Sequence, residues 1–173
     1  MLRPLGRADF DLLAVWLDDP EVARWWPDPH DPADLEAACG PTIDDHDPTE
    51  VLVVEEDGAP VGLVQRYRLA DEPAWAASLV PADPFGIDYL LGAPGSRGRG
   101  LGTRIVGRFV ADSWDRYPGC HACVVGVDRD NAASLGLLRR LGFRTVYEGG
   151  LLDPAPGDGG VQVVLVLDRT DLA

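Results

Sequence analysis

The feature that most limits how this chain can fold is a glycine-rich run, SRGRGLGTR at residues 96–104. It lies between a strand-like segment, Phe85 to Leu91, and a segment from Leu101 to Trp114 in which apolar residues recur at helical spacing. Glycines leave backbone N–H groups accessible, and the first N–H groups of a helix have no partners within the helix. The run therefore predicts a strand–loop–helix unit whose loop can bind an anion such as phosphate.

The rest of the chain predicts an α+β fold, a mixed α/β sheet with helices on both faces. Before the glycine-rich run, we expect a short strand at LRPL, helices at residues 8–17, 21–26 and 32–39, and strands at residues 51–55 and 61–69. After it we expect strands at residues 122–127, 144–148 and 162–167 and a helix at residues 131–141. Asp57-Gly58 predicts a hairpin turn, and the Asp- and Pro-rich residues 27–48 are typical of a surface loop or lid.

Length and composition fit one domain over residues 1–173. Hydrophobic residues make up 46% of the chain, and no apolar run approaches the roughly 18 residues that span a bilayer. Because no secretory signal pattern follows Met1, we expect a cytoplasmic protein, either a monomer or a homodimer. An odd number of cysteines argues against a disulfide framework, and the C-x-x-C of Cys120 and Cys123 lacks a second ligand pair, so no metal site is expected.

The charge of the chain limits its partners. The formal net charge is −14, and every basic side chain apart from histidine is an arginine. Such a surface repels nucleic acid and anionic membranes, so neither is expected as a partner. It attracts cationic small molecules, such as amines with several ammonium groups.

The glycine run does not fit two common phosphate-binding motifs. A dinucleotide-binding fingerprint, G-x-G-x-x-G/A, requires a third small residue where Thr103 lies. A P-loop requires a lysine, which this chain lacks altogether. A plain glycine turn between strand and helix remains an alternative on spacing alone.

Arg97-x-x-Gly100-x-Gly102 at the start of a helix resembles motif A of the GNAT superfamily, the acetyl-CoA-dependent N-acyltransferases. In that family the amides of this loop hold the pyrophosphate of coenzyme A, in agreement with the unpaired N–H groups and the dipole of a helix start. The resemblance implies acetyl-CoA as the cofactor, bound by Arg97, Gly98, Arg99, Gly100, Leu101, Gly102 and Thr103. Arg104 and Arg108 add positive charge near the loop.

A second motif, NAASLGLLRRLGF at residues 131–143, resembles motif B of the same superfamily, N-x-x-A/S-x-x-x-Y-x-x-x-G-F. It adds Asn131 and Ser134 to the expected acetyl-CoA contacts. Leu138 stands where the family has a tyrosine that is often proposed to protonate the departing thiolate. Together the motifs imply the GNAT fold, with a central, mostly antiparallel sheet splayed between the fourth and fifth strands, residues 85–91 and 122–127.

Four further pieces, ARWW, QRYRL, GIDYLLG and APGDGG, are similar to the corresponding pieces of aminoglycoside 6′-N-acetyltransferases. This resemblance implies that Asp88 is the catalytic carboxylate and that Leu90 and Leu91 offer backbone groups to acetyl-CoA. It implies a substrate site formed by Trp25, Trp26, Gln65, Tyr67, Asp88, Asp128 and Asp158. The implied reaction is acetyl transfer to the 6′-amine of aminoglycoside antibiotics, a resistance activity.

Asp88 also stands out without the resemblance, because it interrupts the apolar stretch from Phe85 to Leu91, where a carboxylate is costly unless it is paired or functional. We expect it to bind the substrate ammonium and to accept its proton, with a pKa raised by apolar neighbours. Proximity, and polarisation of the thioester carbonyl by an N–H near Leu91, would supply most of the acceleration. A siderophore-type, lysine-type or polyamine N-acyltransferase and a non-catalytic acyl-CoA-binding module remain open as alternatives.

Overall fold

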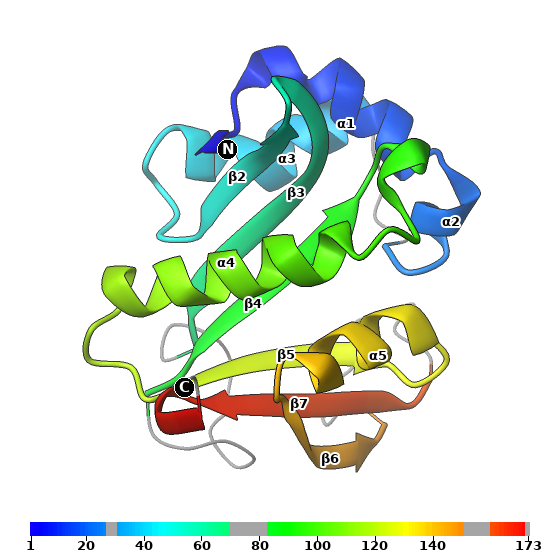
Figure 1. Cartoon of the computed structure of the whole chain (residues 1–173). Helices are drawn as coiled ribbons and strands as arrows, with labels where there is room; N and C mark the ends of the chain where they lie inside the picture. The colour runs from blue at the N-terminus through cyan, green and yellow to red at the C-terminus, as the bar shows by residue number, and fades with distance from the viewer. Residues whose placement is uncertain (27–30, 70–82, 151–159, 172–173) are drawn as a thin grey trace. The chain divides into compact units, whose positions relative to one another are not determined.

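The computed structural model describes residues 1–26, 31–69, 83–150 and 160–171 of the chain (Figure 1). The chain forms two compact units, each made of two separate stretches of sequence. Unit 1 consists of Met1–Arg66 and Asp88–Ile105, and unit 2 consists of Tyr67–Ile87 and Val106–Ala173.

Unit 1 contains an antiparallel arrangement of strands that begins at the N-terminus. The strand β1 (Leu2–Pro4) pairs with β2 (Glu50–Glu56), and β2 pairs with β3 (Ala59–Arg68). The turn between β2 and β3 has φ of 52° at Asp57 and 79° at Gly58. Positive φ at both central residues is the geometry of a type I′ hairpin turn, so the hairpin predicted at these two residues is confirmed.

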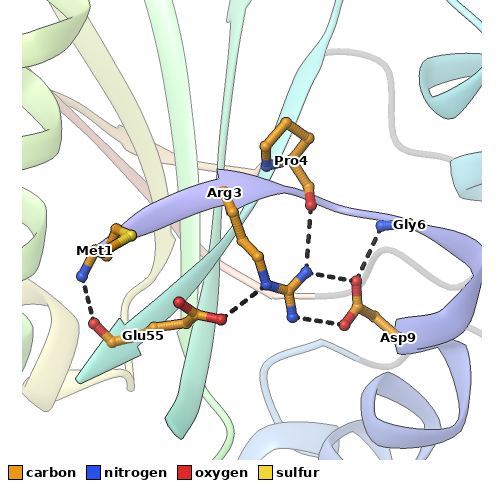
Figure 2. A network of polar contacts seen from close by, with 6 residues as sticks. All are labelled: Met1, Arg3, Pro4, Gly6, Asp9 and Glu55. Atoms are coloured by element: carbon orange, nitrogen blue, oxygen red, sulfur yellow. Dashed lines mark hydrogen bonds and ion pairs between the residues drawn. The ribbon is translucent and has the colours of Figure 1, made fainter. Parts of the chain in front are cut away.

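Arg3 fastens β1 to its surroundings (Figure 2). Its guanidinium donates to both carboxylate oxygens of Asp9, at 2.8 and 2.7 Å, and its Nε donates to Glu55 at 2.8 Å. The backbone N–H of Gly6 donates to the same Asp9 carboxylate at 3.0 Å. The hydrogen bonds from Arg3 and, less strongly, from Gly6 hold the pKa of Asp9 below its usual range.

Three helices pack against these strands, namely α1 (Phe10–Leu17), α2 (Pro20–Ala23) and α3 (Pro32–Ile43). The core of unit 1 includes Leu13, Trp16, Leu17, Val22, Leu35, Val51, Val53, Leu63 and Leu90. Gly92 lies so close to Trp16 that a Cβ at this glycine would meet the indole ring at 2.0 Å. Only glycine fits there, and the chain after β4 therefore packs tightly against α1.

Two of these helices differ in length from the sequence-based prediction. The expected end of α3 at Cys39 is wrong, because the helix continues through Gly40 and Pro41. Its last turn is held by the N–H of Asp44, which donates to Gly40 at 3.0 Å, and by Arg7, whose ion pairs join Glu36 to Asp44 along the exposed face. These contacts offset the hydrogen bond that proline cannot make.

α2 is shorter than the predicted helix over residues 21–26, since its regular part ends at Ala23. The N–H groups of Trp25 and Trp26 both turn back to the carbonyl of Val22, at 2.9 Å. Trp26 is therefore tied to α2 by a backbone hydrogen bond although it lies beyond the helix.

Unit 2 contains β5 (Ala122–Asp128), β6 (Arg144–Gly149) and β7 (Gln162–Asp168), with β7 antiparallel to both of the others. The first residues of β4 (Phe85–Leu91) run parallel to β5, so that Phe85 pairs with Cys123 and Gly86 with Val124. The helix α5 (Ala132–Arg140) connects β5 to β6 (Figure 1).

The predicted fold class, a mixed α+β sheet, is confirmed. Among the residues that the structure describes, seven strands follow the order β1-β2-β3-β4-β5-β7-β6. β4 and β5 are parallel, with registered pairs of Phe85 with Cys123 and of Gly86 with Val124. Within the residues that the structure describes, no helix is long and apolar enough to cross a membrane.

Candidate functional site

The glycine-rich loop connects β4 to the helix α4 (Leu101–Arg116), and the whole run of residues 96–104 belongs to unit 1. Gly98 and Gly100 have φ of 73° and 74°, in the left-handed region that side chains rarely adopt. A Cβ at either position would meet nothing within 4 Å, so the loop backbone is open on that side. An open backbone before a helix start, where N–H groups lack helical partners, fits the pyrophosphate of coenzyme A.

The arginines of the loop divide into two kinds. Arg99 and Arg104 are 63% and 71% exposed, and both approach Glu56, at 3.4 and 3.0 Å. Such exposed pairs are weak, which leaves both guanidinium groups able to turn toward an anion. Arg97, which the sequence assigned to the same task, instead directs its guanidinium to groups of the protein.

Asp88 is half-buried on β4, between the fully buried Ile87 and the half-buried Tyr89. The Nε2 of Gln65, on β3, donates to its Oδ2 at 2.8 Å. This amide fixes the carboxylate and stabilises its charge. Asp88 therefore lies on an apolar strand as the sequence indicated, and it is in direct contact with Gln65, another residue predicted for the site.

A pocket of about 280 Å³ opens within unit 1. It is lined by Leu13, Leu17, Trp26, Leu35, Ala38, Cys39, Thr42, Asp47, Thr49, Val51, Leu63, Gln65 and Leu90. Gln65 both lines the pocket and contacts Asp88, and Leu90 belongs to the same strand as this carboxylate. A ligand in the pocket would thus contact Gln65, which is hydrogen-bonded to Asp88, and Trp26, which lines the same pocket.

Several pocket residues were not predicted from the sequence. Ala38, Cys39 and Thr42 come from α3, and Asp47 and Thr49 come from the segment that follows it. For Thr42 the missing signal was the length of α3, because a helix that ends at Cys39 would not include this residue. Burial raises the pKa of the Cys39 thiol, which therefore stays neutral and contributes an apolar surface.

Trp25 and Tyr67, both predicted to bind substrate, do not line this pocket. The guanidinium of Arg24 lies 4.5 Å from the centre of the Trp25 ring. The ring of Tyr67 lies against Gly86 in unit 2, where a Cβ on the glycine would meet it at 2.5 Å. Tyr67 also packs on the core of that unit.

In unit 2, the polar residues of the second motif build the turn that starts α5. Asn131 accepts a hydrogen bond from the N–H of Ser134 at 3.1 Å and so caps the helix. Asp128 accepts one from the N–H of Asp130 at 2.8 Å. Leu138 is fully buried, so its side chain fills the core of unit 2. Asp158 lies outside the described residues.

The sequence profile described as "Acetyltransferase (GNAT) domain" matches residues 6–151. The chain belongs to this GNAT family. Aminoglycoside N(6′)-acetyltransferase type 1 of Klebsiella pneumoniae is 27% identical to this chain over 109 residues. The matched residues are 61% of this chain and 54% of that protein. The protein of the same name from Serratia marcescens matches to the same extent. The GNAT chain thus spans about half the length of these curated relatives.

Solved structures agree with the GNAT fold. Aminoglycoside acetyltransferase AAC(6′)-Ib in complex with coenzyme A and kanamycin superposes with a TM-score of 0.83 at 22% identity, covering 99% of this chain and 95% of that chain. Spermidine N-acetyltransferase from Vibrio cholerae in complex with CoA and spermine superposes with a TM-score of 0.76 at 17% identity, covering 99% and 96%. At these identities the likeness establishes the fold of the GNAT chain.

Proposed function

We propose that this GNAT protein is an acetyl-CoA-dependent N-acetyltransferase that acts on a primary amine of a polycationic small molecule, first of all the 6′-amine of an aminoglycoside. The observation that carries the proposal is the contact between Gln65 and Asp88 at the wall of the unit 1 pocket. It places a fixed carboxylate on the strand that leads into the glycine loop. In this proposal, residues 1–173 act as one catalytic domain.

Acetyl-CoA supplies the acetyl group, activated as a thioester. The open backbone at Gly98 and Gly100 and the first amides of α4 would hold its pyrophosphate, and Arg99 and Arg104 would exchange Glu56 for its phosphate oxygens. Leu90 and Leu91 would offer backbone groups to the pantetheine arm. Arg97 contributes here through its backbone, because its side chain is engaged with the protein.

Asp88 binds the ammonium of the acceptor and accepts a proton from it, directly or through a water, as the amine attacks. The amide of Gln65 holds the carboxylate in one orientation, so little reorganisation is needed when the amine arrives. Because the attack on the thioester is direct, no covalent enzyme intermediate is required. Fixing the amine beside the acetyl group can supply a large part of the acceleration.

The acceptor is assigned from charge and pocket chemistry. The pocket combines the apolar faces of Trp26 and several leucines with the carboxylate of Asp47 and the hydroxyls of Thr42 and Thr49. Such a lining suits an aminosugar ring, which has an apolar face and cationic and hydroxyl substituents. The names of the curated relatives and the net charge of −14 support the same class of acceptor.

The experiment is a thiol-release assay of the purified protein with acetyl-CoA and a panel of amines. The panel contains an aminoglycoside with a 6′-amine, a matched one with a 6′-hydroxyl, spermidine and lysine, and NMR locates the acetyl group. We expect turnover of the 6′-amine compound and none at the 6′-hydroxyl. Preferred turnover of spermidine or lysine would replace the aminoglycoside assignment, and coenzyme A binding without thiol release from any amine would indicate a non-catalytic module.

A further inference from the structure

Arg97 precedes the two positive-φ glycines of the loop, yet its guanidinium is bound to the protein at three points. Nε donates to the carbonyl of Leu91 at 3.0 Å, and one terminal nitrogen donates to the carbonyl of Gly92 at 2.9 Å and to Asp19 at 2.9 Å. Asp19 lies 78 residues earlier in the chain. The side chain therefore joins the end of β4 to the start of α2.

Asp19 has two tasks, one for each oxygen of its carboxylate. Oδ1 accepts the N–H of Glu21 at 2.9 Å and caps α2, and Oδ2 receives Arg97. The hydrogen bond from Arg97 and, less strongly, that from Glu21 lower the pKa of Asp19 below its usual range. Asp19 therefore stays charged at neutral pH and keeps the ion pair with Arg97.

The two ends of this link lead to two parts of the pocket wall. From Asp19, the backbone bonds of α2 continue to Val22, whose carbonyl accepts the N–H of Trp26 at 2.9 Å. From Leu91, the chain leads directly back to Leu90, and both Trp26 and Leu90 line the pocket. Arg97 is thus the bridge between the segment that carries Trp26 and the strand that carries Asp88.

We propose that Arg97 and Asp19 form a positioning pair, which sets the place of Trp26 relative to β4 and thereby couples the state of the glycine loop to binding of the acceptor. This inference rests on the proposed function, because it assigns the acceptor to the unit 1 pocket. The side chain of Arg97 acts through other residues, while any contact of Arg97 with the donor is made by its backbone. If a bound anion displaces the glycine-rich loop, the side chain of Arg97 would transmit this movement to Trp26 in the acceptor pocket.

The test uses Asp19→Asn, Arg97→Gln and the double variant. Asparagine keeps one oxygen that can accept the N–H of Glu21 and cap α2. Its second polar atom is an amide nitrogen, which cannot accept a hydrogen bond from Arg97. We expect either single change to raise the KM for the acceptor about tenfold, with the Kd of coenzyme A, measured by calorimetry, within about twofold of wild type. The double variant should resemble the single ones, because both changes break the same contact.

A matched control is the pair of Arg3 and Asp9, shown in Figure 2. Asp9 also lies at a helix start, accepts a backbone N–H and pairs with an arginine, and the side chains are similarly exposed, 36% and 15% for Arg3 and Asp9 against 27% and 20% for Arg97 and Asp19. Arg3→Gln and Asp9→Asn should lower the melting temperature without changing the KM for the acceptor or the Kd of coenzyme A. A rise in the acceptor KM in these controls would show a general effect of instability and overturn the proposal.

A second readout does not depend on turnover. Hydrogen exchange of the amides of Val22, Ala23, Trp25 and Trp26, all bonded within this segment, should be faster by about tenfold in Asp19→Asn and Arg97→Gln and unchanged in Asp9→Asn. Unchanged exchange would overturn the proposal, as would an Arg97→Gln variant that weakens coenzyme A binding alone. If wild-type protein acetylates no amine, the proposed function fails, and the exchange rates still decide whether the pair positions Trp26.

Discussion

At the scale of single residues, Gln65 determines how Asp88 can act. The amide of Gln65, on the neighbouring strand, donates to the carboxylate at 2.8 Å, and the same side chain lines the pocket. In the proposed mechanism, this fixed orientation lets the carboxylate receive the ammonium of the acceptor with little reorganisation.

Asp88→Asn tests that role. Asparagine has the same shape and can still contact Gln65, but it cannot accept the proton of the ammonium, so we expect kcat/KM to fall by about two to four orders of magnitude. The melting temperature should change little. Asp168→Asn is a suitable control, since Asp168 pairs with Arg144 on an exposed part of unit 2. An active but destabilised Asp88→Asn protein would remove Asp88 from the mechanism.

Arg97 marks the limit of what sequence could predict at this scale. The motif Arg97-x-x-Gly100-x-Gly102 predicted the loop between β4 and α4 that we propose to bind coenzyme A, and the pattern of apolar residues placed Asp88 on its strand. The partner of the Arg97 side chain is Asp19, and nothing in the local sequence of either residue indicates the other. Contacts between distant segments depend on tertiary packing, so the task of a side chain is predicted less well than its position.

At the scale of elements, the strand–loop–helix unit was predicted well because its signals are local. The bounds of β4 agree with the prediction, since an apolar stretch ends where Gly92 begins the loop. α3 was predicted poorly because the rule that proline ends a helix does not hold at Pro41, after which the helix continues to Ile43 and the N–H of Asp44 still donates to Gly40. That error concealed the part of the pocket formed by Thr42.

Gly100→Val tests the loop. Valine is strained at a φ of 74° and adds a side chain where the backbone must approach phosphate, so we expect coenzyme A to bind at least about tenfold more weakly. Gly58→Val is the matched control, because Gly58 has φ of 79° and equally open surroundings in the β2–β3 turn. Both variants should lose similar stability. Equal affinity for coenzyme A in a folded Gly100→Val protein would contradict the assignment.

The anchoring of β1 predicts a dependence on pH. The pKa of Asp9 is lowered in the folded state by Arg3, so the carboxylate contributes stability above its unfolded pKa of about 4 and loses it as pH falls through the lower folded pKa. We expect the melting temperature to fall below about pH 4, with a shallower fall in Asp9→Asn. Identical acid profiles of the two proteins, measured by circular dichroism, would rule out this contribution.

At the scale of the whole molecule, the net charge of −14 attracts any cationic acceptor toward the protein before it enters the pocket. Exposed charges are screened beyond about 8 Å at physiological ionic strength. We therefore expect the KM for a polycationic acceptor to rise several-fold between about 0.05 and 0.5 M salt, with a smaller effect on a single-amine acceptor. Equal salt dependence of the two acceptors in steady-state assays would contradict this prediction.

The division of each unit into two stretches of sequence has a consequence for recombination. Unit 1 is interrupted by residues 67–87, and unit 2 is interrupted by residues 88–105. Wherever a single crossover with a related gene falls, at least one unit receives its residues from both parents. Exchange of a complete unit requires three crossovers, at residues 66/67, 87/88 and 105/106. Chimeras designed for new acceptor specificity should therefore respect these three junctions, because a simple exchange of N- and C-terminal halves joins residues that never evolved to pack together.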